Sequence, residues 1–424
     1  MEPSPPRPGS RGRIGKATHL LWLVDELIEE VLFRFSPDDP ALLFRAALVC
    51  KRWRRLVSDP GFRRRFREFH RSPPTLGILC KTVAARFTHT RFYRTSPSCP
   101  PIRDRRDWDV LDSRHGRVLM ANALDKLVVW DPITEDQQEL APLPRHAGRA
   151  PNGSLAALCA GAFWTNGSLA VLCAGAAGGG SCDHLDCHRN PFLVVFVGND
   201  SEVMFSCVYS SEDGTWRSEP TVAAHHPHDR LEMSSSAFAG NALYFLFLRR
   251  TKILKYDLGT REMSVIHLPP GSDGVYGELA LMTMEDNSSL GFARREGYTL
   301  NLWSMEADPN GAMRWTQSRV IEHETLLPVD ALSIPPYVVA FAEGMIFMKT
   351  CDGIFSIDLK SCQSKNVLCN DYGIQKVFPY ISFYAPGTAL IILYNMPMFR
   401  TCSVSISIVR IVNKKHVCCT TTII

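Results

Sequence analysis

The stretch Leu127-Val-Val-Trp-Asp-Pro-Ile-Thr134 has two counterparts in the chain, at Ile253–Thr260 and Ile354–Ser361. In each copy a mostly apolar run ends in an aspartate, and a hydroxyl residue follows three positions later. Such a run is typical of a β-strand, and an aspartate at its end accepts hydrogen bonds from the backbone of a reversing chain. The three copies therefore predict three similar strand-turn-strand units.

A further strand candidate precedes each copy, at 118–121, 242–248 and 345–348. The repeated unit is thus a meander, and the copies begin 126 and 101 residues apart. The intervals hold more hairpin material, such as Cys207–Trp216 and Leu300–Trp303. Two blades of about 40–50 residues per interval is the spacing of β-propeller repeats. The region from Leu76 to Asn395 then holds six or seven blades.

Residues 25–74 show a helical spacing instead. From Asp25, five apolar residues fall on one face of a predicted helix: Leu27, Ile28, Val31, Leu32 and Phe35. Asp39-Pro40 and Asp59-Pro60 each combine an N-cap residue with a proline at the first helical position. They predict a short second helix and a fourth helix, and the third helix aligns Val49, Trp53 and Leu56. Because so small a helical unit buries little core, it is expected to dock on a partner.

These helical residues resemble an F-box domain. The resemblance rests on Leu23–Leu32, on Asp38-Asp39-Pro40 and on Leu48–Val57, followed by a tail, Ser58–Phe62, similar to that of large grass families. One position departs from the family pattern, because Val24 stands where a proline is usual. The loss of this proline removes a preset backbone angle at the helix start.

The F-box resemblance implies binding to the Skp-class adaptor of a cullin-RING ubiquitin ligase, chiefly through apolar helix faces. The residues expected to contact this adaptor are Leu23, Leu27, Ile28, Val31, Leu32, Leu42, Leu43, Val49, Cys50 and Trp53. Some of these side chains are also expected to fill the core of the helical unit. Their spacing does not separate the two roles.

The repeats resemble the propeller of plant, particularly grass-type, F-box proteins. Its blade signatures are matched at His115–Leu119, Val129–Pro132, Val208–Ser211 with Trp216, and Leu254–Asp257. The expected architecture is an α plus all-β multidomain chain: a disordered leader over 1–18, an F-box over 19–72, a propeller over 75–400 and a terminal strand or tail over 401–424. The resemblance implies a non-catalytic substrate receptor, whose propeller loops bind a target protein and whose adaptor links it to a cullin.

Charge is unevenly distributed along the chain. The net charge is +4, of which residues 1–71 carry +6 and the remaining 353 residues carry −2. The basic segment 51–71 leaves nucleic-acid binding open as an alternative function, since lysine and arginine neutralise phosphates. Its bases lie on both sides of a phenylalanine stripe (Phe62, Phe66 and Phe69), without loop aromatics for base stacking. A solvated helix face is therefore the favoured interpretation.

Catalytic and cofactor signals are weak. No Gly-x-Ser-x-Gly and no Walker phosphate loop occurs, so no cofactor is expected and a propeller enzyme is the minor alternative. The residues of metal-ligand type at close spacing are Cys182, His184, Cys187 and His188, with His225, His226 and His228 further on. A single Cys-x4-Cys beside a glycine-rich loop is poor support for a tetrahedral zinc site, so a surface loop is expected.

No secretion or membrane signal is recognised. The apolar run Leu20–Val24 is too short for a signal peptide, and the uncharged stretch between Arg149 and Asp183 is interrupted by Asn-Gly and glycine-rich turns. Two short strands around an Asn-Gly turn are expected there. Cysteines such as Cys159, Cys173 and Cys207 are expected to be free buried thiols of an intracellular protein, in the cytoplasm, the nucleus or both.

Overall fold

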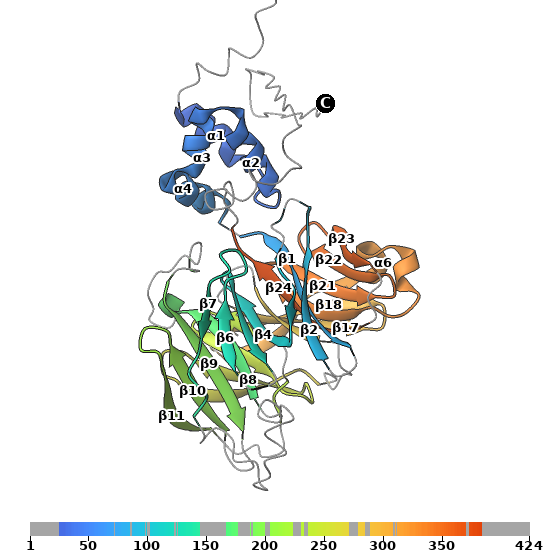
Figure 1. The fold of residues 1–424 in the computed structure, drawn as a ribbon. Helices are drawn as coiled ribbons and strands as arrows, with labels where there is room; N and C mark the ends of the chain where they lie inside the picture. Colours follow the sequence, from blue (N-terminus) through green and yellow to red (C-terminus); the bar gives the residue numbers. More distant parts are fainter. Residues whose placement is uncertain are drawn as a thin grey trace, which may run out of the picture. The chain divides into compact units, whose positions relative to one another are not determined.

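The computed structural model describes most of the chain between Asp25 and Phe383. The described residues are 25–71, 73–84, 87–97, 99, 102–122, 124, 126–144, 167–176, 187, 190–199, 204–223, 230–232, 236–270, 279–284, 289–307, 310, 312–369 and 373–383. They form two compact units, a helical unit up to His70 and a β-propeller from Arg71 on (Figure 1). The predicted leader 1–18 and tail 401–424 lie outside the described residues.

The helical unit consists of four short helices: α1 (Asp25–Phe33), α2 (Pro40–Val49), α3 (Lys51–Ser58) and α4 (Pro60–His70). Pro40 and Pro60 begin helices, as predicted, and the Asp59 carboxylate accepts a hydrogen bond from the Phe62 N–H at 2.8 Å. The prediction that Val49 belongs to the third helix is wrong. Val49 ends α2, because Cys50 is extended and its Sγ caps α3 by accepting from the Trp53 N–H at 3.5 Å.

The core of the helical unit takes side chains from all four helices. They are Ile28, Leu32, Leu43, Ala46, Ala47, Trp53, Val57, Phe62 and Phe66. Phe33 of α1 stacks on Phe62 of α4 with ring centroids 5.3 Å apart. The predicted five-residue face of the first helix is wrong at Leu27, which points to solvent. Phe35 lies beyond the end of α1 but packs against the same core.

Among the described residues the propeller has six blades, which confirms the lower of the two predicted numbers. Each blade is a four-stranded antiparallel sheet. The first blade in chain order consists of β4 (Trp108–Arg114), β5 (Arg117–Asn122), β6 (Leu127–Trp130) and β7 (Gln137–Glu139), and the second of β8 (Gly167–Cys173), β9 (Phe192–Asn199), β10 (Met204–Ser210) and β11 (Thr215–Ala223). The third consists of β12 (Ala237–Ala239), β13 (Ala242–Leu246), β14 (Lys252–Asp257) and β15 (Met263–His267). The fourth consists of β16 (Leu279–Thr283), β17 (Leu290–Glu296), β18 (Thr299–Ala307) and β19 (Met313–Glu322). The fifth is β20 (Tyr337–Ala342), β21 (Met345–Thr350), β22 (Gly353–Asp358) and β23 (Ser364–Cys369).

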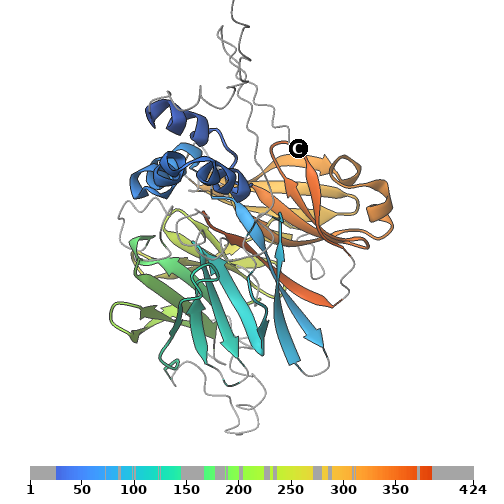
Figure 2. The same cartoon turned by 45° about the horizontal axis from the view of Figure 1, so that its top comes forward.

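The sixth blade joins the two ends of the propeller. It consists of β24 (Ile374–Ile381), β1 (Thr75–Ala84), β2 (Phe87–Arg94) and β3 (Arg105–Arg106), in that spatial order. β24 pairs antiparallel with β1, with Cys80 opposite Val377. The Tyr380 hydroxyl donates to the Gly116 carbonyl of the next blade at 3.1 Å. The blades thus close into a ring, which Figure 2 shows from a second side.

The three repeated aspartates form the same turn in every second blade, as the sequence predicts. Asp131, Asp257 and Asp358 end the third strand of their blades or follow it directly. Each Oδ1 accepts hydrogen bonds from the backbone N–H groups two and three residues later, at 2.7–3.3 Å. These N–H donors lower the pKa of Asp257, since they stabilise its charged form. In each turn the residue after the hydroxyl residue has a positive φ of 55–62°.

Tryptophans of two outer strands bond to the preceding blade. The Trp216 indole of β11 donates to the Ala141 carbonyl at 2.7 Å, and the Trp315 indole of β19 donates to the His267 carbonyl at 2.8 Å. Apolar side chains between the sheets complete each blade interface. At two of the blade interfaces, a tryptophan indole on the outer strand therefore donates a hydrogen bond to the preceding blade.

Candidate binding surfaces

The helical unit exposes apolar side chains at the end of α2 and on α1. Leu27 of α1, 52% exposed, and Val49 of α2 are open to solvent. Val31, Leu42 and Cys50 are half-buried. The remaining described members of the predicted adaptor set, Ile28, Leu32, Leu43 and Trp53, lie in the core of the unit, and Leu23 lies outside the described residues. The structure thus divides the predicted set into surface and core side chains.

Leu48 was not among the predicted contact residues, although its side chain is half exposed beside Val49. Near Leu48, α2 buries Leu43, Phe44, Ala46 and Ala47. Because Phe44 lies four residues before Leu48 on the same helix face, the helical period of α2 alone does not predict that Leu48 is exposed.

Ion pairs join α1 to α3 and α4. Arg52 Nε lies 2.6 Å from the Asp25 carboxylate, and Arg65 Nη2 donates to both oxygens of Glu29 at 2.7 and 2.8 Å. Along the sequence, Leu27 is two residues from Asp25 and Val49 is three residues from Arg52. This pair therefore holds the first turn of α1 against the junction of α2 and α3, near the exposed apolar side chains.

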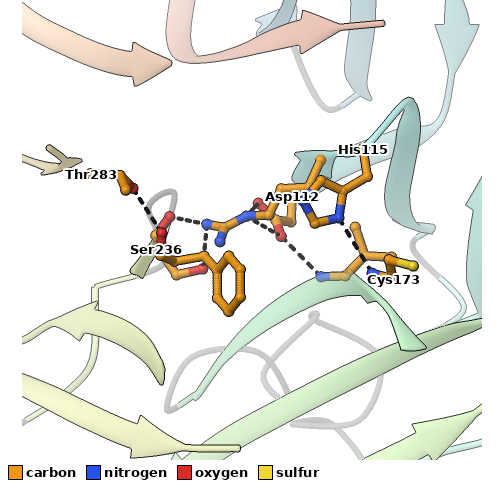
Figure 3. Close-up of polar contacts among 8 residues, drawn as sticks. Asp112, His115, Cys173, Ser236 and Thr283 are labelled. Carbon is orange, nitrogen blue, oxygen red and sulfur yellow. Dashed lines mark hydrogen bonds and ion pairs between the residues drawn. The ribbon is translucent and has the colours of Figure 1, made fainter. Parts of the chain in front are cut away.

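A second group of polar side chains lies on the inner strands of the propeller (Figure 3). Asp112 and Arg114 of β4 form an ion pair with a separation of 3.2 Å. Asp112 Oδ2 accepts from the Val171 N–H of β8 at 2.9 Å, and Arg114 Nη2 donates to Ser236 Oγ, just before β12, also at 2.9 Å. Burial raises the pKa of Asp112, while Arg114 and the backbone donors oppose this rise.

Two further bonds belong to the same group. His115 Nδ1 accepts from the Cys173 N–H of β8 at 3.3 Å, and Thr283 Oγ1 of β16 donates to the Phe238 carbonyl of β12 at 2.8 Å. Figure 3 shows these contacts running from blade to blade between side chains and backbone groups. Since they join inner strands of four successive blades, the contacts stabilise the ring.

A buried ion pair lies beside these strands. Arg250 donates to both carboxylate oxygens of Glu232, at 2.7 and 3.0 Å, and to the Leu279 carbonyl of β16 at 3.4 Å. Both side chains are almost fully buried. A buried charge is costly unless it is paired and hydrogen-bonded, and these bonds supply that compensation while joining two blades.

The structure describes only some of the residues named in the metal-binding and thiol predictions. Of the predicted metal-ligand types, Cys187 is described and is buried, whereas Cys182, His184, His188, His225, His226 and His228 lie outside the described residues. Within the described ranges no group of three or more metal-ligand side chains occurs. Cys173 and Cys207 are buried thiols outside any disulfide of the described residues, as predicted, and Cys159 lies outside the described residues.

Comparison with protein families agrees with this architecture. The profile described as "F-box protein AT5G49610-like, beta-propeller" matches residues 109–387, more than half of the chain. The chain belongs to this family. The F-box domain profile matches residues 20–65, which include α1, α2 and α3. The F-box implies binding to a Skp1-class adaptor, and F-box proteins are typically non-catalytic components of ligases.

A search of curated proteins found no match to the chain. Three solved structures are similar to this F-box propeller chain at low sequence identity. A protein of unknown function from Bacteroides thetaiotaomicron is 10% identical, with a TM-score of 0.35, over 73% of this chain and 85% of its own. A nidogen/laminin complex chain is 10% identical, with a TM-score of 0.38, over 73% and 99%. A chain from a complex of KlAtg21 with the coiled coil of AgAtg16 is 12% identical, with a TM-score of 0.36, over 71% and 82%. Because these TM-scores are below 0.5, no argument rests on them.

No helix among the described residues is long and apolar enough to cross a membrane.

Proposed function

We propose that this protein is the substrate-recognition subunit of a ubiquitin ligase of the Skp, cullin and F-box type. The observation that carries the proposal is the F-box match at residues 20–65 on a helical unit with exposed apolar side chains. In this role the helical unit binds the adaptor, and the propeller binds a target protein. The chain then contributes binding and placement, since holding a target near the ligase raises its effective concentration.

The adaptor contact is assigned to the exposed and half-buried apolar side chains. They are Leu27, Val31, Leu42, Leu48, Val49 and Cys50. Burial of such side chains at an interface is favourable because it removes apolar area from water. Ile28, Leu32, Leu43 and Trp53 act in this proposal by setting the shape of the unit, and Leu23 keeps its predicted contact role.

The alternative of nucleic-acid binding is weakened by the ion pairs of the basic segment. Arg52 and Arg65 are paired with acids of α1, and Arg64 lies 3.5 Å from Glu68. A phosphate would have to compete with these carboxylates. The proposal places the protein inside the cell, in the cytoplasm, the nucleus or both. The nine described cysteines form no disulfide with one another, which is consistent with a reducing compartment.

Co-purification with a Skp-class adaptor tests the proposal. The full chain is co-expressed with the adaptor, as the wild type and as Leu48→Glu/Val49→Glu. The wild type is expected to retain the adaptor and the double variant to lose it, because two charges replace exposed apolar contacts. Leu124→Glu, at an exposed leucine of the propeller, is the matched control and is expected to retain the adaptor.

A wild-type chain that fails to bind the adaptor would overturn the adaptor role. A double variant that binds the adaptor as well as the wild type does would overturn the assignment of the contact to Leu48 and Val49. Circular dichroism of each variant confirms that the helices remain, since the substituted side chains point to solvent.

A further inference from the structure

One end of the propeller exposes large apolar side chains on two neighbouring blades. In a blade of four antiparallel strands, the turn between the second and third strands and the connection to the next blade lie at the same end. At that end the β17–β18 turn, the β19–β20 connection and the start of β20 carry Tyr298, Val329, Ile334 and Tyr337. Their side chains are 40–78% exposed.

The segment under these side chains is packed against the core. The connection contains the short helices α6 (His323–Leu326) and η6 (Val329–Leu332), and Leu326, Leu327 and Ala331 are buried in the interface of the two blades. The His323 N–H donates to the Tyr298 carbonyl at 2.9 Å. The Cys351 thiol of the β21–β22 turn donates to the Ala331 carbonyl at 3.5 Å. The exposed side chains therefore project from an anchored backbone.

The same surface is acidic. Glu322, Glu324, Asp330 and Asp352 are exposed and form no ion pair within the part of the chain that the structure describes. The stretches 322–337 and 350–353 contain no lysine or arginine. Two cations are neighbours of Tyr337. The Arg295 guanidinium lies 5.7 Å from the centre of the Tyr337 ring, and Lys349, opposite Tyr337 on β21, donates to the Ile374 carbonyl at 2.9 Å. The four apolar and four acidic side chains together are called the acidic apolar surface below.

The acidic apolar surface lies at the end of the propeller away from the point where the chain enters it. β1 is the second strand of its blade and begins at Thr75, so it starts at the end opposite the turns between second and third strands. The Ser382 N–H donates to the Pro74 carbonyl at 3.2 Å, which places the exit of β24 at the same end as the entry. The entry into β1 and the exit from β24 therefore both lie at the end opposite the acidic apolar surface.

We propose that the acidic apolar surface binds a target segment that combines apolar side chains with lysine or arginine. The inference rests on the proposed receptor function and names the chemistry of the target. Exposed tyrosine, valine and isoleucine offer apolar area to bury, and aromatic side chains are frequent anchors at interfaces. Unpaired carboxylates at the rim attract a basic partner and repel an acidic one. A nucleic acid or an anionic membrane is disfavoured for the same reason.

Selection from a random dodecapeptide phage library tests this chemistry. The bait is the immobilised full chain, and the selected peptides are synthesised and titrated by fluorescence anisotropy. Enriched peptides are expected to combine leucine, isoleucine or aromatic residues with lysine or arginine. Their affinity is expected to fall as ionic strength rises, because salt screens the exposed carboxylates.

Matched variants locate the binding. Val329→Ser/Ile334→Ser removes exposed apolar area, and Glu324→Lys/Asp330→Lys reverses charge. The Ser333 hydroxyl and the Cys351 thiol donate to the backbone carbonyl of Asp330, so the second double variant keeps these acceptors. Each is expected to weaken the selected peptides at least about tenfold. Leu124→Ser, 78% exposed at the same end of another blade, and Glu212→Lys, in the β10–β11 turn at the opposite end, are expected to bind as the wild type does.

Three results would overturn the inference. They are the absence of any enriched peptide, the enrichment of acidic or uncharged peptides, and binding of the selected peptides by both double variants as tightly as by the wild type. Adaptor binding is measured in parallel for every variant. A chain that loses the peptides but keeps the adaptor supports the acidic apolar surface. A wild-type chain that binds the peptides but not the adaptor contradicts the ligase role alone, so the two failures are distinguishable.

Discussion

The burial of a single histidine makes the stability of the fold depend on pH. His323 of α6 is fully buried, and neither Nδ1 nor Nε2 has a hydrogen-bond partner among the described residues. Burial, assisted by the nearby Arg295, lowers the pKa of His323 from 6.5 to about 4. The imidazole is therefore neutral in the folded protein at neutral pH, and protonation opposes folding.

The stability of the folded chain is expected to fall on acidification because of His323. Above pH 6.5 the imidazole is neutral in both the folded and the unfolded chain; between pH 6.5 and 4 the unfolded chain takes up a proton that the folded chain does not. The loss of unfolding free energy at pH 5 is about 2 kcal/mol. Urea unfolding at pH 7 and pH 5 measures it. His323→Leu is expected to show a smaller decrease, and an equal decrease in the variant would contradict the assignment.

Residue patterns predicted some side chains well and others poorly. The turn aspartates Asp131, Asp257 and Asp358 were predictable because their hydrogen bonds are local and each copy repeats them. The exposure of Leu27 was not, because a helical period shows which residues share a face but not how far neighbouring helices cover it. Leu48 was missed for the same reason, since Phe44, four residues earlier on the same face of α2, is buried.

At the scale of elements, the blades are joined by bonds between elements distant in sequence. The Trp216 indole reaches the segment after β7, and the Trp315 indole reaches β15. Trp303 is a contrast, because it stacks on Phe292 at 5.8 Å while its indole N–H has no partner in the described part of the chain. Trp303 therefore contributes packing alone, whereas Trp216 and Trp315 also contribute an indole hydrogen bond.

Replacement of Trp216 by phenylalanine is expected to destabilise the propeller by about 1–2 kcal/mol beyond the loss of packing, since the Ala141 carbonyl loses its donor. Urea unfolding of Trp216→Phe and Trp303→Phe makes the comparison, because the second change removes similar area without a hydrogen bond. Equal destabilisation of the two variants would show that the blade-to-blade bond contributes nothing.

A local sequence pattern predicted some strands of the propeller but not the closing one. Strands β5, β13 and β21 were predicted before the three turns and are present there. The closing strand β24 was not identified, because Pro379 within it argues against a strand when only neighbours in sequence are considered. Its place at the edge of the sheet makes the proline acceptable, and pairing with β1 depends on residues far away in sequence.

At the scale of the whole molecule, the ring depends on β24. This strand pairs with β1 and packs between the inner strands β20 and β4. A chain that ends after residue 373 lacks the strand and leaves the backbone groups of β1 unpaired. Such an edge is a template for pairing with other chains.

Truncation after residue 373 is therefore expected to give an aggregated protein. Truncation after residue 400, the predicted end of the propeller domain, keeps β24 and is expected to give a soluble one. Size-exclusion chromatography of both proteins at equal concentration measures the difference. A monodisperse protein ending at residue 373 would show that the ring tolerates an open blade.

The blade shared by both ends of the chain also sets the order of events on the ribosome. Synthesis delivers β1, β2 and β3 first and β24 last, so the first three strands wait for their inner partner while five other blades are made. At ~5–20 residues per second this wait lasts on the order of tens of seconds. Throughout it the nascent chain presents an open edge at β1, which a chaperone would have to shield until translation passes Ile381.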